Sequence, residues 1–321
     1  MKKRLLCFLI AMFILAGTMF TACTPAPNGG ETQNSDTGNT VSAEDPADDG
    51  VLRILMVGNS FCYYFTDELY GMLESAGIKA QVSNVYYPGC SVSQHSDWLY
   101  DNSPNYEFIT VDEKGRDAKV SFHLKACLEA ENWDIITLQQ HFEPNTALNE
   151  NACKESTLTI AGSLFTYLKE NYPLSKLLWH HTWAYQVGYQ GPLGSDPANV
   201  PNEKKVLDVQ TQTTGYENIR AAALAVCEQN SVGRIPSGDA WQIARTNPVI
   251  GDTLCNKEKT DYYHDGDIGG GQYLNACVWF EVVTGQSCVG NTFRPAGYEL
   301  SQEKITALQE AAHQAVADMA S

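Results

Sequence analysis

Positive charge is scarce in this chain. Its 321 residues include 21 Lys and Arg against 38 Asp and Glu, which gives a formal net charge of −17 at pH 7. Nucleic-acid binding relies on Lys and Arg side chains that displace counterions from phosphates, so the charge balance argues against a nucleic-acid partner. An acidic surface is common among soluble proteins, and by itself it identifies no ligand.

The chain also lacks a C-x-x-C pair, which argues against a zinc site. Of its 10 cysteines, Cys7 and Cys23 lie near the N-terminus and the others are spread along the rest of the chain. An even number of these in an exported chain permits disulfides. Cys127 and Cys277, however, fall in apolar helical patterns, where a thiol behaves as a small buried side chain. The sequence leaves open whether one or two disulfides form, or none.

Sequence motifs for cofactors are weak as well. The glycines at 269–271 do not follow an expected strand, so nucleotide binding is a poor interpretation of them. The stretch DGDIGGG at 265–271 lacks the regular oxygen ligands of an EF-hand loop, and it is better interpreted as the loop before a helix. We therefore expect neither a metal nor an organic cofactor.

Long apolar runs are absent except at the N-terminus. Three basic residues at 2–4 precede an apolar run over about 5–20, the arrangement of an export signal. The run is too short and too early for a permanent transmembrane helix. It ends in FTAC, which resembles a bacterial lipobox with Phe20 where Leu is usual. We expect a signal peptide over 1–22 and a lipidated Cys23 that anchors the protein in the bacterial cell envelope. A plain secretory signal, with Cys23 as an ordinary thiol, is the alternative.

The segment after Cys23 has almost no large apolar side chains. Residues 24–50 read TPAPNGGETQNSDTGNTVSAEDPADDG, a composition that buries too little surface to fold. Residues 23–50 are therefore predicted to form a tether that lets a folded domain stand off a membrane. That domain is expected over 51–321.

Within 51–321, apolar runs alternate with helical patterns. The runs predict strands at 52–58, 80–87, 133–140 and 176–183, and a weaker fifth at 232–238. Helices are predicted at about 66–77, 120–129, 155–170, 206–228, 271–284 and 302–319. This alternation is typical of an α/β/α sandwich, in which helices cover both faces of a central, mainly parallel sheet of about five strands.

A polar turn follows the first expected strand. Gly58, Asn59 and Ser60 come directly after an apolar run, and in parallel sheets ligand sites form at the carboxyl ends of the strands. Ser60 can therefore face a cleft. An ordinary turn is the alternative, because Gly, Asn and Ser all favour turns.

A second polar cluster lies near the other end of the chain, in the stretch TDYYHDGDIGGG. Asp261 precedes His264 by three residues, close enough to bond the imidazole and fix its tautomer. A serine hydroxyl needs such a base to act as a nucleophile.

The order Ser60, Asp261, His264 resembles the SGNH (GDSL-like) hydrolase superfamily, in particular a bacterial branch with GNSF as its first block. The resemblance implies a flavodoxin-like fold, with Ser60 as nucleophile, His264 as general base and then acid, and Asp261 orienting His264. Gly89, in YYPGCSVSQH, is similar to the glycine of the second block, whose backbone N–H joins that of Ser60 in the oxyanion hole.

The third block departs from the superfamily's pattern. Where Gly-x-Asn-Asp is usual, this chain has LQQHF. Gln139 or Gln140, at the end of the same expected strand, is the predicted source of a side-chain donor to the oxyanion.

Substrate contacts are predicted from polar and aromatic residues near these blocks, because rings with polar tips suit a wet cleft and stack on sugars. They are Asn59, Tyr63, His181, Trp183 and Tyr263. The expected activity is an esterase that removes acetyl or other short acyl groups from glycans. A glycan-binding lipoprotein that kept the fold and lost the chemistry, or a lipase or thioesterase, is the alternative.

Overall fold

The computed structural model describes residues 49–191, 205–255, 270–296 and 299–319. The expected signal peptide and Cys23 lie outside these residues, as do Asp261, Tyr263 and His264. The compact unit Pro46–Ser321 holds the described residues. None of the helices in the described part of the chain combines the length and apolar composition that a bilayer crossing requires.

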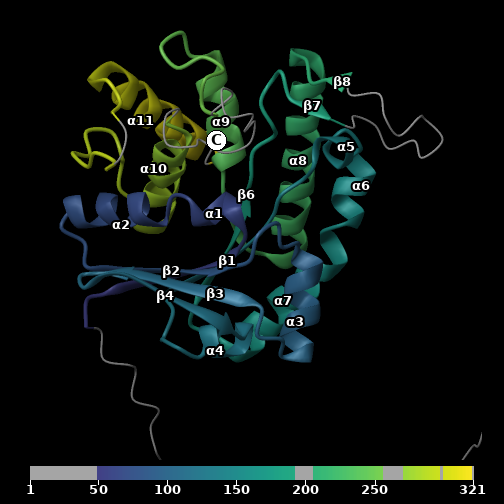
Figure 1. Cartoon of the computed structure of the whole chain (residues 1–321), viewed down its shortest axis with the longest axis vertical. Helices are drawn as coiled ribbons and strands as arrows, with labels where there is room; N and C mark the ends of the chain where they lie inside the picture. The colour runs from purple at the N-terminus through teal and green to yellow at the C-terminus, as the bar shows by residue number, and fades with distance from the viewer. Residues whose placement is uncertain (1–48, 192–204, 256–269, 297–298, 320–321) are drawn as a thin grey trace, which may run out of the picture. The chain divides into compact units, whose positions relative to one another are not determined.

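A seven-stranded sheet forms the centre of this unit (Figure 1). Its strands, in spatial order, are β4 (Gly115–Phe122), β3 (Tyr106–Asp112), β2 (Ala80–Tyr86), β1 (Leu52–Gly58), β5 (Ile135–Gln140), β6 (Lys176–His181) and β9 (Gly233–Ile235). The pairs β2–β1, β1–β5, β5–β6 and β6–β9 are parallel, and β3 is antiparallel to both β2 and β4. A separate antiparallel pair is formed by β7 (Gln190–Gly191) and β8 (Lys205–Val206). The mostly parallel α/β sheet confirms the predicted fold class.

Helices cover both faces of the sheet. The central strand β1 has apolar side chains on both sides, and burying them requires a helical layer on each face. Ile54 and Met56 of β1 belong to one core, and Leu55 and Val57 belong to the other. The first core is covered by α2 (Thr66–Ser75), α9 (Ser237–Thr246), α10 (Gly271–Thr284) and α11 (Gln302–Ala317). The second is covered by α3 (Val92–Asp101), α4 (Leu124–Leu128), α7 (Leu158–Asn171) and α8 (Val209–Asn230).

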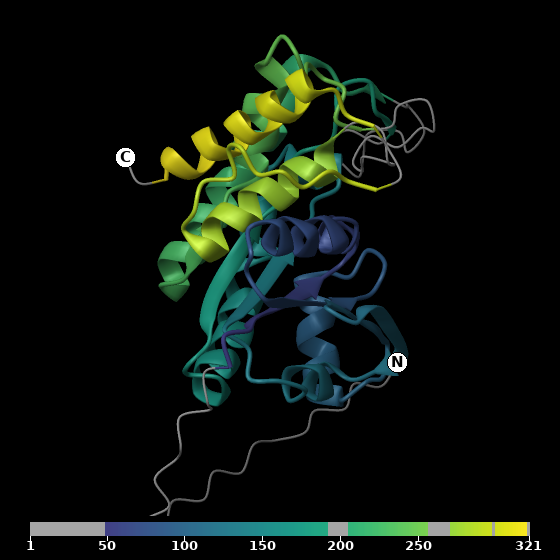
Figure 2. The same cartoon turned by 90° about the vertical axis from the view of Figure 1, so that its left-hand side faces the viewer.

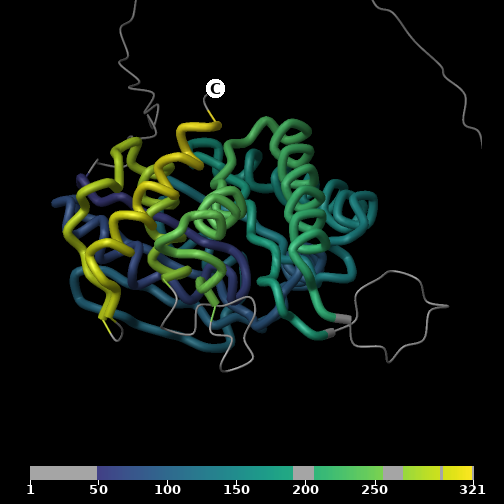
Figure 3. Tube along the Cα trace, turned by 90° about the horizontal axis from the view of Figure 1, so that it is seen from above, coloured from purple at the N-terminus to yellow at the C-terminus, as the bar shows by residue number. Residues whose placement is uncertain are grey.

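The two helical layers can be followed in the figures. Figure 2 shows α10 and α11 packed side by side. Seen from above, yellow α11 and green α8 lie on opposite sides of the strands (Figure 3). Three short helices complete the described fold, namely α1 (Ser60–Tyr63), α5 (Pro144–Ala147) and α6 (Glu150–Glu155).

Each of the five predicted strands is present, but the hairpin β3–β4 was not predicted. The helix expected at 120–129 is therefore wrong in its first half, because 120–122 belong to β4 and only Leu124–Leu128 are helical. β4 reads GRDAKVSF and is exposed along almost its whole length, with Val120 73% exposed. A polar edge strand carries no apolar alternation, so the periodicity that identifies buried strands is missing from it.

Candidate functional site

Ser60 lies where the sequence placed it, directly after β1 at the carboxyl edge of the sheet. Because β2, β5 and β6 run parallel to β1, the loops that follow these strands leave the sheet at the same edge. Gly89 follows β2, and Gln140 ends β5. The structure therefore gathers the first three predicted blocks at one edge.

Asn59, the residue before Ser60, joins these loops. Its side chain is fully buried. The amide nitrogen Nδ2 donates to the carbonyl oxygen of Cys90 at 2.8 Å and lies 2.8 Å from Nδ1 of His141. The oxygen Oδ1 accepts from the backbone N–H of Phe61 at 3.0 Å and from the side-chain amide of Gln139. One buried side chain thus ties together the loops after β1, β2 and β5.

Gln139 continues this network beneath the sheet edge. Its Oε1 lies 3.1 Å from Nδ1 of His180, and Nε2 of His180 lies 3.0 Å from the hydroxyl of Ser237. Because an amide oxygen only accepts, Nδ1 of His180 carries the proton and Nε2 accepts from Ser237. Burial lowers the pKa of His180 to about 3, which keeps the ring neutral.

The predicted oxyanion donors occupy different environments. Gln139 is 2% exposed, and its amide N–H points to Asn59. Gln140 accepts from the backbone N–H of Val92 at 2.8 Å and donates to the carbonyl of His141 at 2.6 Å. Gly89 is exposed in the turn after β2, with a φ of +64 that favours glycine. Both glutamine amides are therefore bonded to protein groups.

A small pocket lies beside Ser60. Most of its wall is aromatic, and two buried amide side chains complete it. The lining residues are Ser60, Tyr64, Phe65, Trp183, Trp241, Gln272 and Asn275. The amide of Asn275 accepts from Nε1 of Trp241 at 2.8 Å, which fixes the orientation of that indole.

The chain enters and leaves the segment 256–269 next to this pocket. A Cβ atom on Gly271 would lie 2.6 Å from the ring of Trp241 and 3.1 Å from the carbonyl oxygen of Leu254. Leu254 and Gly271 are therefore close to each other and to a wall of the pocket beside Ser60. Asp261 and His264 lie on the segment between them, outside the described residues.

The residues predicted to contact substrate differ in their exposure to solvent. Tyr63 is partly exposed, and its ring stacks on that of Tyr86 with centroids 4.2 Å apart. Asn59, His181 and Trp183 are buried. His181 lies at the end of β6 with Nδ1 2.9 Å from the guanidinium of Arg234, and Trp183 lines the pocket beside Ser60. Tyr263 is outside the described residues.

Two residues at this edge were not singled out from the sequence. Trp241 belongs to no recognised sequence motif, and it lies inside α9, a helix that was not predicted. His141 was quoted only as part of LQQHF, although a histidine directly after a central strand is itself a signal of a site. His141 stacks on Phe61, the residue after Ser60, and Trp241 lines the same pocket as Ser60.

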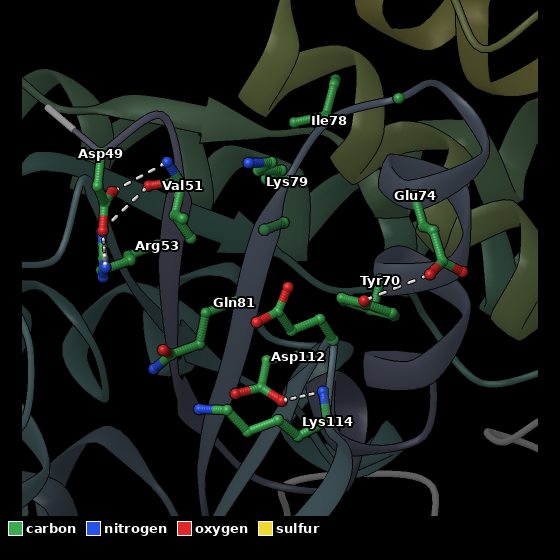
Figure 4. Close-up of a pocket in the computed structure, with 13 residues that line it drawn as sticks. Asp49, Val51, Arg53, Tyr70, Glu74, Ile78, Lys79, Gln81, Asp112 and Lys114 are labelled. Atoms are coloured by element: carbon green, nitrogen blue, oxygen red, sulfur yellow. Dashed lines mark hydrogen bonds and ion pairs between the residues drawn. The ribbon is translucent and has the colours of Figure 1, made fainter.

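A second pocket lies at the opposite, amino-terminal edge of β1 and β2 (Figure 4). Two pairs of its side chains are bonded to each other, Arg53 with Asp49 and Tyr70 with Glu74. It contains none of the predicted site residues. Within the described ranges, no group of three or more His, Cys, Asp or Glu side chains is placed to hold a metal ion.

Comparison with known proteins places the chain in a family. Residues 53–315 match the family model described as Domain of unknown function (DUF4886). A solved DUF4886 family protein from Bacteroides uniformis ATCC 8492 has a TM-score of 0.67 and 27% sequence identity, covering 83% of this chain and 95% of that chain.

Two other solved structures are more distant. A candidate GDSL-like lipase from Parabacteroides merdae ATCC 43184 has a TM-score of 0.43 and 15% identity, covering 73% of this chain and 95% of that chain. Phospholipase A1 from Streptomyces albidoflavus NA297 has a TM-score of 0.40 and 12% identity, covering 73% of this chain and 98% of that chain. Among curated proteins, the comparison finds no match.

Proposed function

Since the chain belongs to the family of the domain of unknown function DUF4886, we propose its activity from the site itself. The protein is a serine hydrolase that cleaves carboxylic esters. Ser60 is the nucleophile, His264 is the general base and then the acid, and Asp261 orients His264. The resemblance of the residue order to SGNH hydrolases supports these roles.

One observation carries this proposal. Leu254 and Gly271, on either side of the segment that bears Asp261 and His264, lie close to each other, and Gly271 lies against Trp241, which lines the pocket with Ser60. His264 is six residues from Gly270, and an extended chain reaches about 3.4 Å per residue. The segment is therefore long enough to bring His264 to Ser60.

The proposed reaction follows from these roles. His264 takes the hydroxyl proton of Ser60 as Oγ attacks the ester carbonyl, and the negative charge forms on the carbonyl oxygen. Collapse of this intermediate breaks the bond to the alcohol, which leaves with the proton from His264. Water then attacks the acyl-enzyme with His264 again as the base, which releases the carboxylic acid and restores Ser60. Backbone N–H groups of Ser60 and Gly89 stabilise the oxyanion.

The proposed substrate is an acylated carbohydrate that carries acetyl or another short acyl group. The small size of the pocket beside Ser60 favours a short acyl chain. Tyr63, partly exposed and stacked on Tyr86, offers an aromatic surface near Ser60 that suits a sugar ring.

We also propose that the protein is exported and anchored in the bacterial cell envelope through a lipid on Cys23. The basic residues at 2–4, the apolar run and the FTAC sequence support this location. Metabolic labelling with a palmitate analogue tests it, and labelling that persists in Cys23→Ser would contradict it.

The activity is tested by hydrolysis of p-nitrophenyl acetate, butyrate and decanoate. We expect Ser60→Ala and His264→Ala to lose activity while Ser163→Ala, an exposed serine on α7, keeps it. The rate should fall from acetate to decanoate. An unchanged rate in a folded Ser60→Ala protein would rule out Ser60 as the nucleophile.

A glycan-binding protein without catalysis is the second candidate. It is favoured by the amides of Gln139 and Gln140, because each amide nitrogen already donates one hydrogen bond to a protein group and is oriented by it. This candidate predicts that the protein binds acetylated glycans, that Ser60→Ala binds them equally well, and that neither protein hydrolyses an ester.

A further inference from the structure

We propose that His141 supplies the side-chain hydrogen bond to the oxyanion through its Nε2–H group. This inference rests on the proposed esterase activity and names a catalytic residue for it. His141 takes the role that the sequence pattern suggested for Gln139 or Gln140, whose amide nitrogens each donate a hydrogen bond to a protein group.

The sheet brings His141 level with Ser60. β1 and β5 are parallel neighbours, with Val57 opposite Leu138. Ser60 and His141 each lie three residues beyond this pair, and neighbouring strands are about 4.8 Å apart. The ring of His141 stacks on Phe61, the residue after Ser60, with ring centroids 5.3 Å apart and planes 25° apart.

The partners of Asn59 fix which nitrogen of His141 carries a proton. The backbone N–H of Phe61 must donate, so the atom that it meets is Oδ1 of Asn59, and the carbonyl of Cys90 must accept, so the atom that it meets is Nδ2. Nδ2 therefore points a hydrogen at Nδ1 of His141, 2.8 Å away. Because Nδ1 accepts this hydrogen, it carries no proton of its own. A neutral imidazole then has its single N–H at Nε2.

This arrangement suits a donor to a developing negative charge. A hydrogen bond that is already oriented needs no rearrangement when the charge forms on the carbonyl oxygen. His141 is held by the bond from Asn59 and by stacking on Phe61, and its side chain is 15% exposed.

The same buried amide also holds the second expected donor loop. Nδ2 of Asn59 binds the carbonyl of Cys90, which directly follows Gly89. The loops that contain Ser60, Gly89 and His141 are thus all tied to Asn59. In the reaction the carbonyl electron pair moves onto oxygen as Oγ of Ser60 bonds to carbon, and Nε2–H of His141 donates a hydrogen bond without transferring its proton.

The test compares His141→Phe, His141→Leu and His141→Gln in the purified protein with p-nitrophenyl acetate. Phe keeps a flat ring without a donor, and Leu is a second apolar replacement in case Phe does not fold. Gln can place an amide N–H near the position of Nε2. His313→Phe, on a ring that is 52% exposed on α11, is the matched control.

We expect the folded apolar variants to lose about 100-fold or more in kcat, with KM changed by less than about threefold, because a donor to the oxyanion acts in the transition state. His141→Gln should recover at least about tenfold of that loss, and His313→Phe should match the wild type. An apolar variant within about fivefold of the wild-type kcat would overturn the role of His141. A Ser60→Ala protein that retains the wild-type rate would instead overturn the esterase proposal itself.

Discussion

Trp183 lies flat against Trp241, with ring centroids 4.4 Å apart and planes 2° apart. Trp183 follows β6, and Trp241 belongs to α9. Phe61 packs against Trp183, with ring centroids 4.6 Å apart. The stacked indoles therefore link the residue after Ser60 to the place where the segment 256–269 begins and ends. We expect the packing around Trp241 to be sensitive to small changes in volume.

Gly271→Ala tests this packing. The added methyl group would lie 2.6 Å from the ring of Trp241, and the indole is held by Trp183 and by its bond to Asn275. Because the ring cannot move away freely, we expect the free energy of unfolding to fall by about 1 to 3 kcal/mol. Urea denaturation followed by tryptophan fluorescence measures the change.

Gly215→Ala is the matched control for Gly271→Ala. Gly215 lies inside α8, and a methyl group there would be 3.5 Å from Cβ of Ala147, an ordinary contact. Alanine is the better helix former by about 1 kcal/mol, so this variant should be at least as stable as the wild type. Equal stability of the two variants would mean that Trp241 yields to the added group.

Ser237→Ala tests the buried network under the sheet edge. The substitution removes the hydroxyl that donates to Nε2 of His180 and leaves a buried acceptor without its partner. We expect a loss of about 1 to 3 kcal/mol in the free energy of unfolding. Ser163→Ala, on the exposed face of α7, should change the stability by less than about 0.5 kcal/mol. Similar small effects for both would show that the hydroxyl contributes little.

The central part of the fold was predictable from the sequence, and the reasons are local. β1 and β5 are apolar runs bounded by polar residues, because both of their faces are buried. The hairpin β3–β4 was not predicted, because its outer strand is exposed and lacks an apolar pattern. The helix α3 was also missed, although Ser91 and Gln94 form a capping box that is recognisable in the sequence.

The site was predictable in position more than in detail. That Ser60 follows a central strand could be inferred from one apolar run and one polar turn. That the amide of Gln139 turns inward to Asn59 and His180 depends on hydrogen bonds between three neighbouring strands. No local pattern encodes those contacts, so the sequence pointed to Gln139 and Gln140, whereas the donor that we propose from the structure is the next residue, His141.

The cysteines provide a third prediction. Each of the eight from Cys62 to Cys288 is a free thiol in the structure, and Cys227 alone among these eight is not fully buried. Burial raises the pKa of the Cys227 thiol to about 11, so it is mostly protonated and reacts slowly. With iodoacetamide at about pH 8, we expect slow modification of Cys227 in the native protein and modification of all eight after denaturation. A disulfide-linked peptide among these eight in mass spectrometry would contradict the prediction.

Stability should fall in mild acid because three imidazoles are buried in the neutral form. Burial lowers the pKa of His95, His180 and His181 to about 3 in each case, although Asp239 partly opposes this shift at His181. The same groups titrate near 6.5 in an unfolded chain. Between about pH 6.5 and 3, the unfolded state therefore binds more protons than the native state. The free energy of unfolding then decreases as the pH falls through this range.

His95→Phe isolates one of these contributions. The imidazole of His95 stacks on Tyr106, with planes 6° apart, so a phenyl ring fits the same site without taking up a proton. Each imidazole contributes up to about 1.4 kcal/mol per pH unit, and the slope of unfolding free energy against pH should decrease by this amount in the variant. Tyr106→Phe is the control, because it removes the hydroxyl that lies 2.8 Å from Nδ1 but keeps the imidazole. It should lower stability and leave the slope unchanged. Carboxylates contribute to the slope in all three proteins alike, so an unchanged slope in His95→Phe would mean that His95 is already protonated in the native state at these pH values.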